Sequence, residues 1–503
     1  METSLNTSLL LILAIVSATT WYALDYFYVP KQLPNEPPLV GHHIPYIGHI
    51  IGLLRHGTRY YQIISANCNL PIYTLKMLNM KAYVVTSPAL VSAVNRNSKN
   101  IAFNPFIAKL GKRTTGHDEA TSQIVQHNLN GENGPGYVIQ LHDDTVASLA
   151  PGKSLENMTQ AMLKQVSPYL DALANDAEVN LFEWTRNMVT MCSTRAVYGP
   201  NNPFNRDRTL ITSFWEYDHD LNLLIADIAP SILAPKGYRA RNKLARAFQE
   251  YFENYDPIRS QSSAMTQARY TNATRQGITP LNQARLEVGT LIGILANTIP
   301  SIFYLLVHIY HDPALISDIR KELASQGLLS TPEEIAQNPK LLSMPESCPL
   351  LHSTWQELLR VHALGISARL VLEDVMLDDR FLLQKGMIVQ MPMAVMHSDS
   401  TAWGEDVTEF QPRRFLKQKN SSNTYKKNLT AYRPFGGGAS LCPGRHFVTL
   451  ETMALAACMV SRFDLSPVKG QWTIPRQQQE SFATNVFPPA KDIRVKVTLR
   501  ENP

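Results

Sequence analysis

The sequence predicts a large, mainly helical domain with a minor share of sheet, behind a short apolar N-terminal segment. Apolar residues follow helical spacing over most of the stretch 154–270 and again over 283–308. Alternation with a period of two is confined to short runs. Of the 503 residues, 44% are apolar and 18% are charged, and no linker, charge run or internal repeat divides the chain. One sizeable core is therefore expected.

The charge and the cysteines exclude several classes of protein. The net charge of +5 is small for this length, and the basic residues are scattered, so nucleic acid is not an expected partner. The five cysteines are odd in number and far apart, without a CxxC pair, which argues against a disulfide scaffold or a zinc site and favours a reducing compartment. They are Cys68, Cys192, Cys348, Cys442 and Cys458.

The N-terminus predicts a membrane anchor over residues 1–30. Residues 9–24 carry no charge, and the apolar run resumes after Asp25 as far as Pro30. A spanning helix needs roughly 20 residues. Lys31 follows the run, which places the body on the cytosolic side. The alternative is a cleaved signal peptide with a cleavage site near residues 16–18; its first residues would contain Glu2 and no Lys or Arg, which favours the anchor.

A proline-rich hinge is expected over residues 31–50, before a catalytic body over 51–503. Residues 34–49 contain four prolines and two glycines. Such a composition stiffens an extended chain, so the segment is interpreted as a spacer that orients the body against a membrane. An ordinary proline-rich loop is the alternative.

The first elements of the body are expected to be a hairpin and a helix. Residues 72–75 and 83–85 are predicted strands, and a helix is expected to open at Pro88. Further on, residues 223–235 are unusually apolar and are followed at once by the basic stretch 236–241. Two interpretations stay open for this segment: contact with a bilayer surface, or a buried helix pair.

The longest predicted helix, 283–308, approaches membrane length. Asn297, Thr298, Pro300 and His308 would be costly in lipid, so a buried core helix is expected. Pro300 predicts a kink and frees carbonyls that a hydroxyl, water or a ligand must satisfy. Beyond it the pattern predicts a helix over 353–362 and strands over 369–373 and 493–499.

The stretch FGGGASLCPGR, residues 435–445, combines glycines with one cysteine before Pro-Gly. Pro443 suits the first turn of a helix that 446–460 can continue, which places Cys442 at the positive end of a helix dipole. Glycines let backbone N–H groups approach the sulfur. A single thiolate with an open opposite face suits an oxygen-activating haem. From this stretch alone, a tight turn with a buried cysteine stays equally open, whereas its glycine spacing differs from a dinucleotide-binding fingerprint.

Taken with four other segments in order, this loop makes the chain resemble the cytochrome P450 family over nearly its whole length. The resemblance implies the P450 fold, a large helical domain with small sheets and a haem between the long central helix and the cysteine loop. The segments are residues 44–49 (IPYIGH), 296–298 (ANT), 357–360 (ELLR), 410–415 (FQPRRF) and 435–445.

The resemblance also implies a role for each matching residue. Cys442 would be the axial ligand of haem b, and Phe435 would cover the sulfur side of the macrocycle. Glu357 and Arg360, at i and i+3 on one helix face, would form a buried charged cluster with Arg414 that holds the cysteine loop. The remaining implied haem-binding residues are Gly436, Gly438, Gly444 and Arg369, the last as the partner of a haem propionate.

Three departures from the family pattern bear on the chemistry. Asn297 stands where most members have an acid before Thr298, so the expected catalytic pair Asn297 and Thr298 must deliver protons through Thr298 and water. Ser440 replaces an arginine of the loop. The helix-forming stretch after the first strands has no W-x-x-x-R and offers only Lys153. The pattern is most similar to the branch that holds sterol 7-alpha-hydroxylases and prostacyclin synthase.

The function implied is a monooxygenase in the endoplasmic reticulum membrane, with one N-terminal pass and a cytosolic catalytic domain. It would insert one oxygen atom into a hydrophobic, sterol- or terpenoid-like molecule, with electrons from NADPH through cytochrome P450 reductase. Two alternatives stay open: a reductase-independent isomerase or dehydratase acting on a peroxide, and a haem-binding protein without turnover.

Family analogy also suggests where the substrate pocket lies. Its walls are expected in residues 104–139, 204–235, 365–368 and 481–487. Other metal-binding residue types, His352, His362, His397 and Cys458, are expected in the core or on the surface rather than as ligands.

Overall fold

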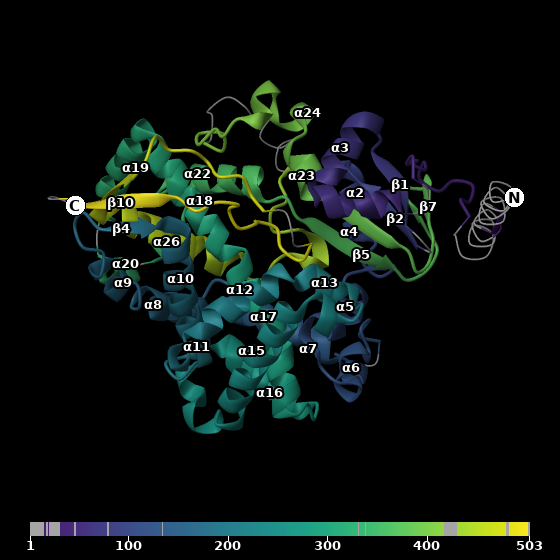
Figure 1. Cartoon of the computed structure of the whole chain (residues 1–503), viewed down its shortest axis with the longest axis horizontal. Coiled ribbons are helices and arrows are strands. Elements are labelled where there is room, and N and C mark those ends of the chain that lie inside the picture. Colours follow the sequence, from purple (N-terminus) through teal and green to yellow (C-terminus); the bar gives the residue numbers. More distant parts are fainter. Residues whose placement is uncertain are drawn as a thin grey trace, which may run out of the picture. The chain divides into compact units, whose positions relative to one another are not determined.

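The computed structural model describes residues 15, 16, 19, 31–44, 47–77, 80–132, 134–329, 331–337, 339–416, 430–478 and 482–500. They form two compact units, Met1–Ala102 with Ser367–Pro392, and Phe103–Ile366 with Met393–Pro503. Helices dominate and the sheets are small (Figure 1), which confirms the predicted fold class. The predicted anchor over 1–30 lies almost wholly outside the described residues.

The first unit is built on a five-stranded sheet in the order β1-β2-β8-β5-β3. Ile72 pairs with Val85 in an antiparallel hairpin, which confirms the first predicted strands. Arg369 lies on β5, which begins and ends earlier than the predicted 369–373. The strands are β1 (Ile72–Met77), β2 (Met80–Val85), β3 (Ile101–Ala102), β5 (Ile366–Val371), β6 (Val375–Leu377), β7 (Phe381–Leu383) and β8 (Ile388–Pro392). The helices are α2 (Gly48–His56), α3 (Arg59–Cys68) and α4 (Pro88–Arg96), the last opening at proline as predicted.

The proline-rich segment is fastened to this sheet. The N–H of Thr74 on β1 donates to Pro38 O at 2.8 Å, and the N–H of Val40 donates to Thr74 O at 3.0 Å. Glu36 forms a fully buried ion pair with Lys81, 2.7 Å apart, and also accepts from the Tyr83 hydroxyl at 2.5 Å. A buried, multiply bonded charge pair of this kind is costly to break, so the segment is an ordered part of the unit.

The second unit is almost entirely helical, with one small sheet. Its early helices are α5 (Asn104–Thr115), α6 (Glu119–Gln126), α7 (Tyr137–Leu149), α8 (Lys153–Leu163), α9 (Ser167–Asp171), α10 (Leu181–Tyr198), α11 (Pro203–Arg206), α12 (Thr209–His219), α13 (Leu221–Ala226), α14 (Pro230–Leu233), α15 (Pro235–Glu253), η1 (Asp256–Gln261) and α16 (Ala264–Arg275). The predominance of helix predicted over 154–270 is confirmed.

The later helices are α17 (Pro280–Leu291), η2 (Ile292–Ala296), α18 (Thr298–His311), α19 (Pro313–Ser325), α20 (Pro332–Gln337), α21 (Lys340–Ser343), α22 (Pro349–His362), α23 (Met393–His397), α24 (Ser400–Trp403), η3 (Glu405–Thr408), η4 (Gly438–Ser440) and α26 (Arg445–Arg462). The sheet pairs β10 (Arg494–Leu499) with both β4 (Glu178–Asn180) and β9 (Phe463–Pro467). The helix predicted over 353–362 and the strand predicted over 493–499 are confirmed within a few residues.

The long predicted helix is real but interrupted. Proline starts α17, where Thr279 caps the N–H of Asn282. The π-helical turn η2 then shifts the hydrogen-bond pattern just before Asn297, so the predicted kink lies slightly ahead of Pro300. Every residue from 298 to 310 is buried, as expected for a helix that is apolar all round.

This helix forms the centre of the unit, where α18 packs against α10, α22 and α26. Within the described residues, Pro280–His311 is long and apolar enough to cross a membrane, yet 72% of its most apolar window is buried inside the protein. It is the core helix that its polar residues predicted.

Candidate active site

The cysteine loop is a tight turn that ends in a helix. Gly436 and Gly438 have φ values of 74° and 62°, a left-handed conformation that glycine adopts without strain. The N–H of Cys442 donates to Phe435 O at 3.0 Å, which closes the loop on itself. The helix α26 begins three residues after the cysteine, close to the predicted start.

Two effects act on the Cys442 thiol in opposite directions. Burial raises the pKa of this thiol, whereas the backbone N–H groups of Gly444 and Arg445 and the Arg445 charge lower it. The Arg445 side chain also donates to Cys442 O at 3.0 Å, which fixes the cysteine backbone. Burial is the larger effect, so the pKa of this partly buried thiol is raised overall. A bound cation would favour the thiolate and the neighbouring N–H groups would stabilise its charge, so the environment fits a thiolate ligand of haem iron.

A buried charged cluster surrounds Glu357, which is fully inaccessible to solvent. Arg360 binds it in a bidentate manner, at 2.7 and 2.8 Å. Arg414 Nε lies 3.1 and 3.2 Å from the two carboxylate oxygens. The N–H of Gln411 donates a further bond at 2.9 Å, and Asp406 supplies Arg414 with a second carboxylate at 3.0 Å. The three residues named from the sequence are therefore in direct contact.

The cluster reaches the start of the cysteine loop through His397. Arg360 donates to His397 O at 3.0 Å, and also to the carbonyls of Val407 and Glu409. The His397 ring in turn accepts the N–H of Arg433 at 3.1 Å. Burial and the Arg360 charge lower the pKa of His397 to about 3, so the ring stays neutral and keeps this acceptor.

At the break in the long helix, Asn297 and Thr298 differ in their hydrogen bonds, although they were expected to act together. The Asn297 side-chain oxygen accepts the N–H groups of Asn485 at 2.7 Å and Val486 at 3.2 Å. The Asn297 backbone carbonyl accepts the Ser301 hydroxyl at 2.7 Å. Thr298 is 4% exposed, and its hydroxyl has no hydrogen-bond partner in the part of the chain that the structure describes.

Two arginines are candidates to neutralise an acidic cofactor. Arg369 is buried within the first unit, where it donates to the Ser367 hydroxyl at 2.9 Å and to Ala368 O at 2.8 Å. Arg433, which was not expected from the sequence, is half-buried two residues before the cysteine loop and has no acidic partner among the described residues. Burial lowers the pKa of its guanidinium. A charged residue inside the otherwise apolar stretch before Phe435 was the signal that could have identified it.

Ser440 stands where the family pattern has an arginine. Its hydroxyl donates to Gly437 O at 3.2 Å and so stabilises the turn of the cysteine loop.

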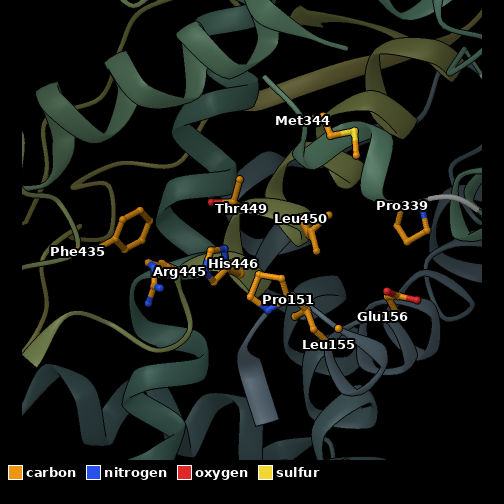
Figure 2. A pocket seen from close by; sticks show the side chains of 11 residues that line it. Pro151, Leu155, Glu156, Pro339, Met344, Phe435, Arg445, His446, Thr449 and Leu450 are labelled. Carbon is orange, nitrogen blue, oxygen red and sulfur yellow. The ribbon is translucent and has the colours of Figure 1, made fainter. Parts of the chain in front are cut away.

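A cavity of about 560 Å³ lies beside the first turns of α26. Figure 2 shows Phe435 and Arg445 at one end of it and Pro339 and Glu156 at the other. None of the segments predicted to form the substrate pocket contributes to its lining. This cavity is therefore distinct from the predicted substrate pocket.

The other residues of metal-binding type were expected either in the core or on the surface, and the structure places them in the core. His352, His362, His397 and Cys458 are all buried. The His362 ring contacts the His308 ring at 2.8 Å, and burial lowers the pKa of His362 to about 3. Across the described ranges, no group of three or more His, Cys, Asp or Glu side chains is placed to hold a metal ion.

With this geometry in hand, comparison with known proteins defines the class. The family model of cytochrome P450 matches residues 37–493. The chain belongs to the cytochrome P450 family and is an oxidoreductase of the monooxygenase class. Membership implies a haem-thiolate cofactor, which the environment of Cys442 fits.

Two relatives and one solved structure are similar to the chain over most of its length. It is 33% identical over 482 residues to cytochrome P450 monooxygenase nodJ of Hypoxylon pulicicidum, covering 93% of this chain and 90% of that protein. It is 24% identical to cholesterol 7-alpha-monooxygenase of Cricetulus griseus, covering 97% of each. The solved structure of retinoic acid-bound cyanobacterial CYP120A1 covers 93% of this chain and is itself covered completely, with a TM-score of 0.71 and 18% identity, and so shows the same fold.

Proposed function

We propose that the protein is a membrane-bound monooxygenase that inserts one oxygen atom from O2 into a hydrophobic sterol- or terpenoid-like secondary metabolite. Electrons would come from NADPH through cytochrome P450 reductase at the endoplasmic reticulum membrane. The environment of Cys442 carries this proposal: its partly buried thiol lies on a tight glycine turn directly before α26, beside the N–H groups of Gly444 and Arg445. The similarity to nodJ supports the monooxygenase reaction, and the similarity to cholesterol 7-alpha-monooxygenase supports a sterol-like substrate.

The residues would divide the work as follows. Cys442 would bind the haem iron, with Phe435 beside it and Gly436, Gly438 and Gly444 allowing close approach. Arg369 and Arg433 would neutralise the haem carboxylates. The Glu357 cluster would hold the loop in register through Arg360 and His397. When bound, the haem supplies the activation of O2.

Proton delivery would fall to Thr298. The residue is buried and its hydroxyl has no partner in the described residues, so the hydroxyl can bind a water and pass a proton along. The preceding position holds Asn297, an amide, and not a carboxylate. This absence of an acid at position 297 also favours a second candidate, a peroxide isomerase or dehydratase that needs no reductase.

The deciding experiment is the carbon monoxide difference spectrum of the purified protein, reduced either by NADPH with the reductase or by dithionite. A Soret band at the thiolate position formed through the reductase supports the monooxygenase. If only dithionite forms the band, the isomerase is favoured and peroxides become the substrates to test. A band without any turnover favours a haem-binding protein, and its absence contradicts thiolate ligation by Cys442.

A further inference from the structure

The segment 482–487 is held by asparagine side chains from two helices. The side-chain oxygen of Asn222 on α13 accepts the N–H of Phe482 at 2.9 Å. The side-chain oxygen of Asn297, at the start of α18, accepts the N–H groups of Asn485 and Val486 at 2.7 and 3.2 Å. A backbone N–H can only donate, so in both asparagines the oxygen must face the segment.

A third contact completes the fixation of this segment. The N–H of Leu364 donates to Asn485 O at 2.8 Å. A Cβ atom at the next residue, Gly365, would lie 1.9 Å from the Asn485 side-chain oxygen, so only glycine fits there. Val486 and Phe487 are 2% and 1% exposed. The helix break, the segment 482–487 and the loop between α22 and β5 are therefore joined at Asn485.

This arrangement assigns Asn297 a task other than proton transfer. An amide cannot release and regain a proton as a carboxylate does, and its oxygen already accepts two hydrogen bonds. Removing that oxygen would leave the part-buried N–H groups of Asn485 and Val486 without their acceptor, which is unfavourable. An aspartate would keep both acceptor bonds.

We propose that Asn297 is a positioning residue: its side-chain oxygen fixes the segment 482–487 against the break in the long helix. Because family analogy suggests that this segment is a wall of the substrate pocket, its fixation would help to orient the substrate. The role in substrate orientation rests on the proposed function. The fixation itself is independent of it, because it follows from hydrogen bonds that need no cofactor.

The first test is hydrogen–deuterium exchange of the haem-loaded full-length protein. Asn297→Leu should speed exchange in the peptide covering 482–487 by about tenfold, since each lost bond is worth about 1 kcal/mol or more. Asn297→Asp should exchange like the wild type. Asn222→Leu is the matched control and should affect Phe482 while leaving 485 and 486 protected. Unchanged exchange in Asn297→Leu overturns the proposal; should that variant not fold, Asn297→Ala takes its place.

The second test separates this inference from the proposed function. Imidazole probes only access to the iron, whereas the bulky azole clotrimazole also contacts the pocket walls. Asn297→Leu should weaken clotrimazole binding by about tenfold and imidazole binding by less than about twofold. Equal weakening of both probes overturns the role in orienting ligands. If imidazole causes no spectral change even in the wild type, haem ligation fails, and the exchange result alone decides the fixation.

Discussion

Cys442 is the residue proposed to bind the haem iron, because its partly buried thiol lies beside the N–H groups of Gly444 and Arg445 at the start of α26. Cys442→Ser replaces the thiol by an alcohol that ionises far less readily. We expect the variant to keep most of its helical structure and to lose the thiolate Soret band in the reduced carbon monoxide spectrum. Far-ultraviolet circular dichroism checks the fold. Retention of the band would contradict ligation by this residue.

Thr298 tests proton delivery. Its hydroxyl has no partner in the described residues, so Thr298→Ala should cost little packing while removing the group proposed to bind water near the haem. We expect NADPH consumption to continue while product per NADPH falls, by about tenfold or more. Thr298→Ser, which keeps the hydroxyl, is the control and should restore coupling. Equal coupling in all three proteins would remove Thr298 from the mechanism.

Glu451 on α26 makes stability depend on pH. The Ser193 hydroxyl lies 2.7 Å from Val189 O and 2.5 Å from the Glu451 carboxyl. A hydroxyl has one proton, so if Ser193 donates to Val189, Glu451 must be protonated and donate to Ser193. Burial raises the pKa of Glu451 to about 8, in agreement with this proton count.

The sign of the pH dependence follows. The folded-state pKa lies above the unfolded value, so the stabilisation is complete at low pH and is lost as the pH rises through about 8. The wild type should lose about 1 kcal/mol of unfolding free energy from about pH 7 to about pH 8, and Glu451→Gln should lose less. Urea unfolding at several pH values measures the difference. Burial also raises the pKa of Asp218, to about 7, so Asp218 lowers the unfolding free energy in the same direction as the pH rises. Asp218 is present in both proteins and does not affect their comparison.

At the scale of elements, one buried carboxylate joins α22 to the loops that follow β8. Glu357→Gln would leave Arg360 and Arg414 without their shared counter-ion. We expect a loss of about 3–5 kcal/mol in unfolding free energy, because a buried charge is left uncompensated. Haem retention after gel filtration should fall with it.

The matched control lies one residue from Arg414. Arg413 pairs with Asp318 at 2.6 Å, but both side chains are well exposed. Arg413→Gln should therefore change stability by less than about 1 kcal/mol. Comparable losses in the two variants would show that burial of the Glu357 cluster does not govern its contribution.

At the scale of the whole molecule, exposed apolar side chains bear on membrane contact. Ile228, Ile232 and Leu233 are 65%, 74% and 54% exposed, and α15 begins with basic residues directly after them. This exposure contradicts burial of α14 and favours its contact with a bilayer surface, whereas Leu224 and Ala234 of the stretch 223–235 are buried.

A shortened protein lacking residues 1–30 should then still bind vesicles of phosphatidylcholine with phosphatidylserine. Replacing Ile232 and Leu233 by serine should weaken binding by about tenfold or more, since each contributes about 1–2 kcal/mol when buried in lipid. Co-sedimentation measures the bound fraction. Met376→Ser, at another exposed apolar residue on β6, is the control and should bind unchanged. Undiminished binding of the double variant would exclude α14 as a contact.

The sequence by itself determined the helical class, the first hairpin, the central helix and the residues of the Glu357 cluster. Each depends on local periodicity, on proline at a helix start, or on a motif whose spacing is characteristic of the family. Cys442 could be identified because glycines, proline and cysteine act within one short turn.

Only the tertiary structure decided which residues from distant segments meet. No local pattern relates Asn297 to Asn485, Glu451 to Ser193, or His397 to Arg433, because each pair is joined by the packing of separate segments. The exposure of Ile232 was undecidable for the same reason: an apolar run is compatible with a core or a surface until its neighbours are placed. Local chemistry thus identified the cysteine and its loop, and packing decided what holds them.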